Sequence, residues 1–411
     1  MGGDSCEFRG KGLIDPERKR FVLRKQGGGR QRREGPRSYA SNWVLSGKAR
    51  GSRCVIHIGM HKTGSTSIQQ SLKGFGDDRF LYADLGRQGN HSLPMYTLFS
   101  GRPEHHHLHR VVGRDQDYTR EYAKRTLAAL ERAIGRAGSR TLLISGEDIG
   151  PLAPGDVETL AAFFHQRFKQ VEVVAYVRSP ASYLASGFQQ RIQGGGVRSF
   201  DIENVYRPYQ AKFTKFDRAF GRENVHLWPF DVQTFPDGCV VRDFCDRLGI
   251  GFPSNRIVRV NQSLSRQAVG LLYTYHVFTR ADETKRMRGP EALQLGELVP
   301  GDKFRFSPEI VHRILEAHRN DIEWMERRLG LSLSEDLGPH REGDIRSEAD
   351  LLRPDQKALA KLLRAVGRDP SKAAAIQTPE EVAALVQDWY QQSWPRKLVG
   401  RFRWPWQKAT A

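Results

Sequence analysis

The sequence predicts an α/β fold in which helices flank a central parallel sheet and a helical extension follows at the C-terminus. Short apolar runs typical of buried strands occur at 55–58, 80–83, 141–145, 171–177 and 225–231. Most of the segments between them carry apolar residues at helical spacing, most clearly 117–137, and helices are also expected at 160–168 and 200–220. Strands that alternate with helices favour a parallel sheet. Beyond about residue 264 helical patterns predominate, at 267–279, 308–329, 354–366 and 379–391.

Length and composition limit the class of protein. A chain of 411 residues can form one large or two ordinary domains. No apolar run approaches the ~18 residues of a membrane span. The four cysteines, Cys6, Cys54, Cys239 and Cys245, show no metal-binding or disulfide-rich spacing, which favours a reducing, cytoplasmic location. The net charge of +18 suits anionic ligands or surfaces.

The excess positive charge is unevenly spread. Residues 1–53 hold 14 Lys and Arg against 5 Asp and Glu, without an apolar period or the apolar core of a signal peptide. We expect a disordered basic arm at 1–52, an α/β core at 53–270 and a helical region packed on it at 271–411. A solvated arm is favoured over one that holds membrane or nucleic acid. Residues 394–406 mix Arg and Lys with Trp and Phe, which suits peripheral membrane contact or docking on the chain itself.

The first predicted strand leads into a turn that can bind an anion. Gly59 and Gly64 bracket Lys62, and helical spacing begins after the second glycine. The N–H groups at such a helix start, the helix dipole and the lysine all favour a phosphate-like ligand. The residues expected to line this cradle are His61, Lys62, Thr63, Gly64, Ser65, Thr66 and Ser67.

The order of residues in this turn separates it from a Walker A loop, in which the lysine follows the second glycine. Residues 57–67, His-Ile-Gly-Met-His-Lys-Thr-Gly-Ser-Thr-Ser, resemble the 5′-phosphosulfate loop of sulfotransferases that use 3′-phosphoadenosine 5′-phosphosulfate (PAPS). The bacterial members usually carry Lys-Thr-Gly-Thr-Thr. Ser65 stands in place of the threonine that directly follows the glycine and keeps its hydroxyl group. The resemblance covers about residues 53–270 and implies a P-loop-type nucleotide-binding fold.

A second motif has the spacing of the family's 3′-phosphate site. Arg178 follows the strand at 171–177 directly, and Ser186 comes eight residues later. A guanidinium group can bind phosphate through two parallel hydrogen bonds, and Pro180 suits the start of the helix that carries Ser186. The resemblance implies that Arg178 and Ser186 bind the 3′-phosphate of PAPS, which serves as co-substrate without a metal.

Three residues are candidates for the base that accepts a proton from the acceptor hydroxyl. His91 is the first choice, because a neutral imidazole can take a proton near neutral pH. Asp84 also follows the loop at the distance seen in the family. Glu147 ends a segment that resembles the family's Ser-Ser-Glu, with Gly146 in place of the second serine. A structural histidine and a helix-capping acid are the alternatives for His91 and Glu147.

Two further segments give weaker signals. Residues 261–265, Asn-Gln-Ser-Leu-Ser, resemble the family's Asn-x-Ser-Leu-Ser segment, which closes over the nucleotide, although a helix N-cap explains the serines equally. The histidines at 105–107 and 109 are adjacent and have no acidic or cysteine partner at ligand spacing, so we expect a solvated loop and no metal site.

The resemblance implies transfer of a sulfuryl group from PAPS to a hydroxyl of an acceptor, with a carbohydrate or glycan favoured. Lys62 would stabilise the leaving oxygen, and His91, or else Glu147 or Asp84, would act as the base. A P-loop ATP-dependent kinase and a non-catalytic nucleotide-binding protein are the alternatives. The sequence does not name the acceptor, and no nucleic acid partner is expected.

Overall fold

The computed structural model describes residues 38–39, 51–86, 88–260, 263–279 and 287–393. Three expectations lie outside these ranges. They concern the basic arm, apart from residues 38, 39, 51 and 52, the Asn-Gln pair at 261–262 and the aromatic, basic segment at 394–406.

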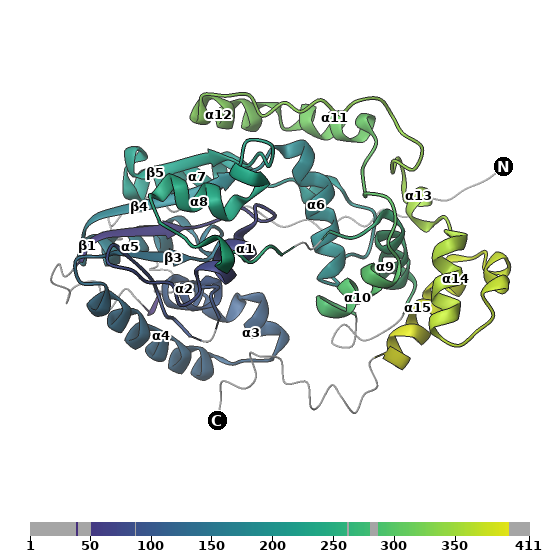
Figure 1. Cartoon of the computed structure of the whole chain (residues 1–411), viewed down its shortest axis with the longest axis horizontal. Helices are drawn as coiled ribbons and strands as arrows, with labels where there is room; N and C mark the ends of the chain where they lie inside the picture. The colour runs from purple at the N-terminus through teal and green to yellow at the C-terminus, as the bar shows by residue number, and fades with distance from the viewer. Residues whose placement is uncertain (1–37, 40–50, 87, 261–262, 280–286, 394–411) are drawn as a thin grey trace, which may run out of the picture. The chain divides into compact units, whose positions relative to one another are not determined.

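The core is a five-stranded sheet in which all neighbouring strands are parallel, in the order β2-β3-β1-β4-β5 (Figure 1). Its strands are β1 Gly51–His57, β2 Phe80–Tyr82, β3 Thr141–Ser145, β4 Phe168–Val177 and β5 Val225–Pro229. The five predicted strands are confirmed, with small changes at their ends. β1 is central, flanked by β3 and β4.

Fifteen α-helices lie in the described part of the chain. They are α1 Ser65–Leu72, α2 Ser92–Phe99, α3 His107–Val111, α4 Gln116–Ala137, α5 Pro154–His165, α6 Pro180–Gln193, α7 Tyr209–Phe220, α8 Val240–Leu248, α9 Arg266–Phe278, α10 Pro290–Leu298, α11 Pro308–Ala317, α12 Arg319–Leu329, α13 Glu348–Leu352, α14 Gln356–Ala365 and α15 Pro379–Ser393.

Apolar side chains cover both faces of the sheet, because successive residues of a strand point in opposite directions. Val55 and Val174 belong to a buried cluster on the face covered by α1 and α8. Their neighbours Ile56 and Val173 belong to the cluster formed with α4, α5 and α7 on the other face. This two-sided burial explains why the strands read as continuous apolar runs in the sequence.

Three predicted helices differ from the structure. The helix expected at 160–168 begins earlier, at Pro154, and ends at His165, and Phe168 already belongs to β4. The helix expected at 200–220 begins only at Tyr209, because Pro208 disfavours helical backbone in the residue before it. The helix expected at 308–329 is two helices, α11 and α12, which meet at His318, whose ring stacks on Tyr206 at 3.8 Å.

Helix α12 ties the C-terminal helices to the sheet. The Asp321 carboxylate accepts hydrogen bonds from the N–H groups of Tyr209 and Gln210 at 2.7 and 2.9 Å and so caps the start of α7. The Arg328 guanidinium donates to both carboxylate oxygens of Asp217, at 2.9 and 3.1 Å, and to the Val225 carbonyl at 2.8 Å. The apolar core is continuous from the sheet into α9, α14 and α15.

We predict that Arg328→Ala lowers the free energy of unfolding by about 3–5 kcal/mol, because it leaves the largely buried Asp217 carboxylate without its partner. Urea unfolding followed by circular dichroism measures the change. Arg319→Ala on the same helix is the control, since its ion pair with Glu316 is exposed and should change stability by less than about 1 kcal/mol. Equal losses in the two variants would contradict the clamping role of Arg328.

Candidate functional site at the carboxyl edge of the sheet

Three chain segments meet where β1, β3 and β4 end. The chain passes from β1 to β2 and β3 on one side and then crosses to β4 on the other. Ligands of parallel α/β sheets bind at such a crossover, outside the carboxyl ends of the strands. His57 of β1 is in register with Ser145 of β3, so the loop at 58–64 and the segment starting at Gly146 leave the sheet side by side. Arg178 follows β4 at the same edge.

The loop after β1 has an unusual backbone. Gly59, Lys62 and Gly64 all have positive φ, at 52°, 66° and 75°, and Lys62 is one of two described non-glycine residues with this property. A Cβ atom at Gly59 would lie 2.8 Å from the Ser65 hydroxyl oxygen, and one at Gly64 would lie 2.6 Å from a methyl group of Val240. Both glycines are therefore required by close approach as well as by φ.

The loop leaves hydrogen-bond donors available at the start of α1. Gly64 is the N-cap residue and has no side chain that could cap the first N–H groups of α1. The Ser65 hydroxyl is buried and has no hydrogen-bond partner in the part of the chain that the structure describes. Thr63 instead donates to the Met60 carbonyl at 2.5 Å and Ser67 accepts from Val260 N–H at 3.0 Å, so these two hydroxyls hold the loop and the 257–260 segment. Uncapped donors at a helix start form an anion site.

Two cations and one carboxylate converge on this loop. Burial lowers the pKa of Lys62 from its usual value, the nearby Arg178 charge lowers it further, and Glu147 opposes both effects. Like charges held together in a partly buried place are stabilised by an anion bound between them. The lowered pKa of Lys62 and the N–H donors at the start of α1 therefore both favour an anion at this loop.

Arg178 fixes the loop from the neighbouring strand. Its Nη1 donates to the Lys62 carbonyl at 2.7 Å, and its Nε donates to the Ser182 hydroxyl at 2.9 Å. The Tyr209 hydroxyl donates to the Arg178 carbonyl at 2.7 Å. The predicted partner Ser186 lies one turn further along α6 than Ser182, and its hydroxyl bonds the carbonyls of its own helix. The structure thus links Arg178 to Ser182 and to the loop.

Glu147 lies against the loop from the side of β3. It begins the 3₁₀ helix η4 Glu147–Ile149, and its Cβ would be 3.3 Å from a Cβ at Gly59. One carboxylate oxygen is 3.3 Å from Nδ1 of His61. The side chain is 22% exposed, so Glu147 can reach a ligand at the sheet edge.

His91 has a different environment from the one expected. It is 1% exposed and lies directly before α2, with Nδ1 accepting a hydrogen bond from Ser145 N–H at 3.1 Å. The backbone N–H of His91 donates to the Ser145 carbonyl at 2.9 Å. Burial lowers the pKa of His91 to about 4, although the Ala83 backbone and the Asp84 charge oppose this change. Asp84 is exposed and accepts from Gly86 N–H in a turn.

The backbone at His91 also explains the glycine at position 146. A Cβ at Gly146 would lie 2.8 Å from the carbonyl carbon of His91 and from the Ser92 nitrogen. A serine does not fit there, in contrast to the family's Ser-Ser-Glu. His91 therefore holds the end of β3, which in turn positions Glu147.

Several polar residues near Glu147 are not apparent from the sequence. Lys212, on α7, has its pKa lowered to about 8 by burial and by Lys215, while Glu147 and Asp148 oppose the shift. Tyr183, on α6, has its pKa raised by burial, while the Arg207 charge lowers it. The sequence predicts that Lys212 lies on a helix but not what its side chain contacts. The packing of α7 against the sheet edge brings it to Glu147.

The histidine-rich segment is helical, and His106 and His109 are buried while His105 and His107 are exposed, so the expectation of a solvated loop is wrong for two of the four histidines. It forms the 3₁₀ helix η3 Pro103–His105 and α3. His109 is fully buried, with Nε2 2.9 Å from the Thr97 hydroxyl, and burial lowers its pKa to about 4. His106 is 4% exposed and lies 3.0 Å from Asp148, an acidic partner 42 residues away in sequence.

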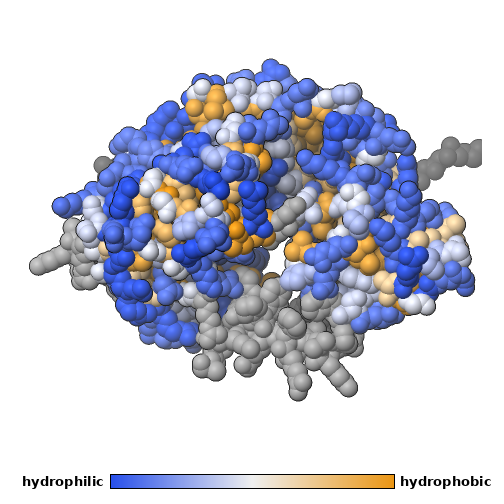
Figure 2. All heavy atoms as spheres, viewed as in Figure 1, coloured by the Kyte–Doolittle hydropathy of each residue, from blue (hydrophilic) through white to orange (hydrophobic). Residues whose placement is uncertain are grey.

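The surface is predominantly polar on the face shown in Figure 2. Among the described residues, the large hydrophobic side chains that remain exposed are Val111, Val112, Val232, Val258 and Leu331. No helix in the described ranges combines the length and apolar composition that crossing a bilayer requires.

Comparisons with known proteins give limited similarity. No family model matches the chain. An uncharacterized protein of Archaeoglobus fulgidus is 28% identical over 127 residues, and the matched part is 30% of this chain and 35%, about a third, of that relative's length.

Solved structures with similar folds include two sulfotransferases. A sulfotransferase from Alicyclobacillus acidocaldarius has 13% identity and a TM-score of 0.36, over 70% of this chain and 98% of that one. The sulfotransferase domain from the curacin biosynthetic pathway has 13% identity and a TM-score of 0.35, over 66% and 99%. Similarity at this level does not assign a function, which has to be argued from the residues of the site.

We predict that His91→Asn makes stability less dependent on pH. Wild-type His91 has its pKa lowered from 6.5 to about 4 by folding, so between these values the unfolded chain binds a proton that the folded chain does not. The free energy of unfolding therefore falls as pH falls through this window, by about 2 kcal/mol at pH 5 for this residue. Asn can keep the acceptor for Ser145 N–H and does not titrate.

Urea unfolding at pH 7 and pH 5 measures the effect. The difference between the two pH values should shrink by about 2 kcal/mol in His91→Asn. His312→Asn, at an exposed position on α11, is the control and should leave the difference unchanged. A wild-type difference retained in His91→Asn would mean that His91 titrates freely in the folded protein.

Proposed function

We propose that this protein transfers a sulfuryl group from PAPS to a hydroxyl group of a polar acceptor. The observation that carries the proposal is the loop after β1. The proposal is supported by the N–H groups at the start of α1, by Lys62 beside the Arg178 guanidinium, and by the Ser65 hydroxyl, which has no hydrogen-bond partner among the described residues. The resemblance of residues 57–67 to the phosphosulfate loop of PAPS-dependent sulfotransferases supports PAPS over other anions.

The donor would bind through two groups of residues. The loop N–H groups and Lys62 would hold the 5′-phosphosulfate, with His61, Thr63, Gly64, Ser65, Thr66 and Ser67 shaping the cradle. Arg178 would bind the 3′-phosphate with the part of its guanidinium group not used for Lys62 and Ser182. Ser186 can join it only if its hydroxyl turns away from the helix carbonyls that it bonds.

The reaction would be a single in-line displacement. The acceptor oxygen attacks sulfur, the bond between sulfur and the bridging oxygen breaks, and 3′,5′-adenosine bisphosphate leaves. Lys62 stabilises the charge that grows on the bridging oxygen, as preorganised donors do in other group transfers. No metal is needed for this step, since Lys62, Arg178 and the N–H groups supply the positive charge.

We assign the proton-accepting role to Glu147 in preference to His91 and Asp84. Glu147 is partly exposed beside the loop, and its charge acts on Lys62. His91 is buried and its pKa is about 4. Around Glu147 lie His61, Tyr183, Lys212 and Arg207, a polar surrounding that suits an acceptor rich in hydroxyl groups, such as a saccharide.

Calorimetric titration with 3′,5′-adenosine bisphosphate tests the donor site. We expect micromolar binding by the wild-type protein and a loss of at least about tenfold in Arg178→Ala, since a charge-assisted hydrogen bond contributes about 1.5–3 kcal/mol. Arg120→Ala, at an exposed position of α4, is the control. A preference for ATP with magnesium, or no binding of the bisphosphate, would favour the kinase alternative.

We predict that Lys62→Ala lowers turnover by at least ~100-fold, because it removes the donor to the leaving oxygen. Transfer from radiolabelled PAPS to a pool of saccharides measures the rate. Lys73→Ala, an exposed lysine just beyond the other end of α1, should leave turnover near the wild-type value.

Glu147→Gln separates proton transfer from binding. Turnover should fall while the affinity for 3′,5′-adenosine bisphosphate is retained. Normal turnover in this variant would remove Glu147 as the base. Tight binding of the bisphosphate by the wild type, with no transfer to any acceptor pool, would favour a non-catalytic binding protein.

A further inference from the structure

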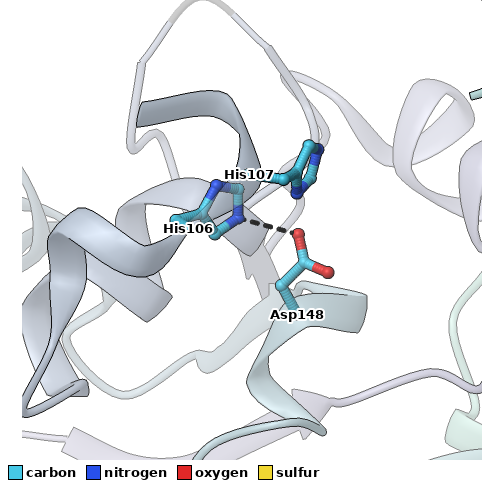
Figure 3. Close-up of side chains that lie close together, drawn as sticks. All are labelled: His106, His107 and Asp148. Carbon is cyan, nitrogen blue, oxygen red and sulfur yellow. Dashed lines mark hydrogen bonds and ion pairs between the residues drawn. The ribbon is translucent and has the colours of Figure 1, made fainter. Parts of the chain in front are cut away.

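A cluster of three metal-ligating side chains lies next to the proposed acceptor side of the site. His106 directly precedes α3, His107 is its first residue, and Asp148 lies in η4, one residue after Glu147. One potential ligand atom from each of the three lies within 4.8 Å of the other two. Figure 3 shows the two imidazole rings and the carboxylate turned toward a common point.

The hydrogen bonds of His106 define which nitrogen faces this point. Its Nδ1 accepts from Leu108 N–H at 3.2 Å, and its Nε2 is 3.0 Å from a carboxylate oxygen of Asp148. Nδ1 is therefore an acceptor and Nε2 carries the proton in the present arrangement. An ion bound at Nε2 requires the ring proton on Nδ1, as in other metal-binding histidines, so the hydrogen bond from Leu108 N–H would give way when the ion binds.

Packing holds the cluster in place. The His106 side chain is 2% exposed and lies between the ring of Tyr96, at 5.1 Å, and the ring of His107, stacked at 4.5 Å. Asp148 N–H donates to the Ser92 hydroxyl at 3.2 Å, which ties η4 to α2. His107 is exposed, so an ion can reach the cluster from solvent past this residue.

We propose that His106, His107 and Asp148 bind a divalent transition-metal ion such as Zn²⁺. Two imidazole nitrogens and a carboxylate oxygen are a ligand set that suits Zn²⁺, and three protein ligands leave a fourth position for water or a substrate oxygen. The separation of His106 and Asp148 is already close to that of two ligands of one ion. Binding at Nε2 would move the ring proton of His106 to Nδ1, since a neutral imidazole binds a metal ion through its unprotonated nitrogen.

An ion bound by this cluster would have two effects. It would join the segment at 103–111 to the end of β3, and it would lie close to Glu147, the residue before Asp148. The inference rests on the three side chains and not on sulfuryl transfer, so either proposal can fail without the other.

Calorimetric titration of the untagged full-length protein with ZnCl₂ tests the proposal. We expect one equivalent to bind and the affinity to fall by at least about 100-fold in His107→Ala, whose exposed side chain can be removed without disturbing the core. Asp148→Asn should have a similar effect. His105→Ala, at the adjacent exposed histidine, is the control and should bind as the wild type does.

Cobalt gives a second readout that does not depend on activity. Co²⁺ added to the wild type should produce the visible absorption of a four-coordinate site, and His107→Ala should lose it. No binding of either ion, or binding that is unchanged in both His107→Ala and Asp148→Asn, would overturn the proposal and leave His106 and Asp148 as a hydrogen-bonded pair. Binding of 3′,5′-adenosine bisphosphate by His107→Ala is measured in parallel and should be retained.

Discussion

The hydrogen bond from the Arg178 guanidinium to the Lys62 carbonyl is the contact on which the arrangement of the site depends. Lys62 has left-handed backbone, which costs a residue with a side chain about 1–2 kcal/mol. The bond joins this strained residue to the end of β4 at 2.7 Å, and Ser182 and Tyr209 hold Arg178 in turn. The loop after β1 is thus fixed by the strand on one side of it.

A second set of contacts fixes the loop from the other side. Nδ1 of His57 lies 2.8 Å from the Ser145 hydroxyl. The Ser145 N–H donates to Nδ1 of His91, and the Ser145 carbonyl accepts from the His91 backbone N–H. These residues are buried, and burial lowers the pKa of His57 to about 3 and that of His91 to about 4. Neutral histidines therefore support the end of β3, and the carboxylates of Glu147 and Asp148 emerge just beyond it.

Much of the fold could be predicted from the sequence, because the strands are buried on both faces and read as apolar runs. The helices were harder to place where tertiary contacts decide their ends. Pro208 delays α7, and the stacking of His318 on Tyr206 accompanies the break between α11 and α12. Helix α10 was missed because its buried residues, Ala292 and Leu295, form too short an apolar pattern.

The sequence by itself determined the parallel α/β core and the glycine-flanked turn around Lys62, because a strand, a glycine turn and a helix start are local features that short-range sterics dictate. It also identified Arg178 and Glu147 as residues at strand ends. Only the tertiary structure decided that His91 is buried, that Arg178 bonds the Lys62 carbonyl, and that Asp148 meets His106. Those outcomes depend on strand register and helix packing, which bring together residues that are 42 or more positions apart, as with His106 and Asp148.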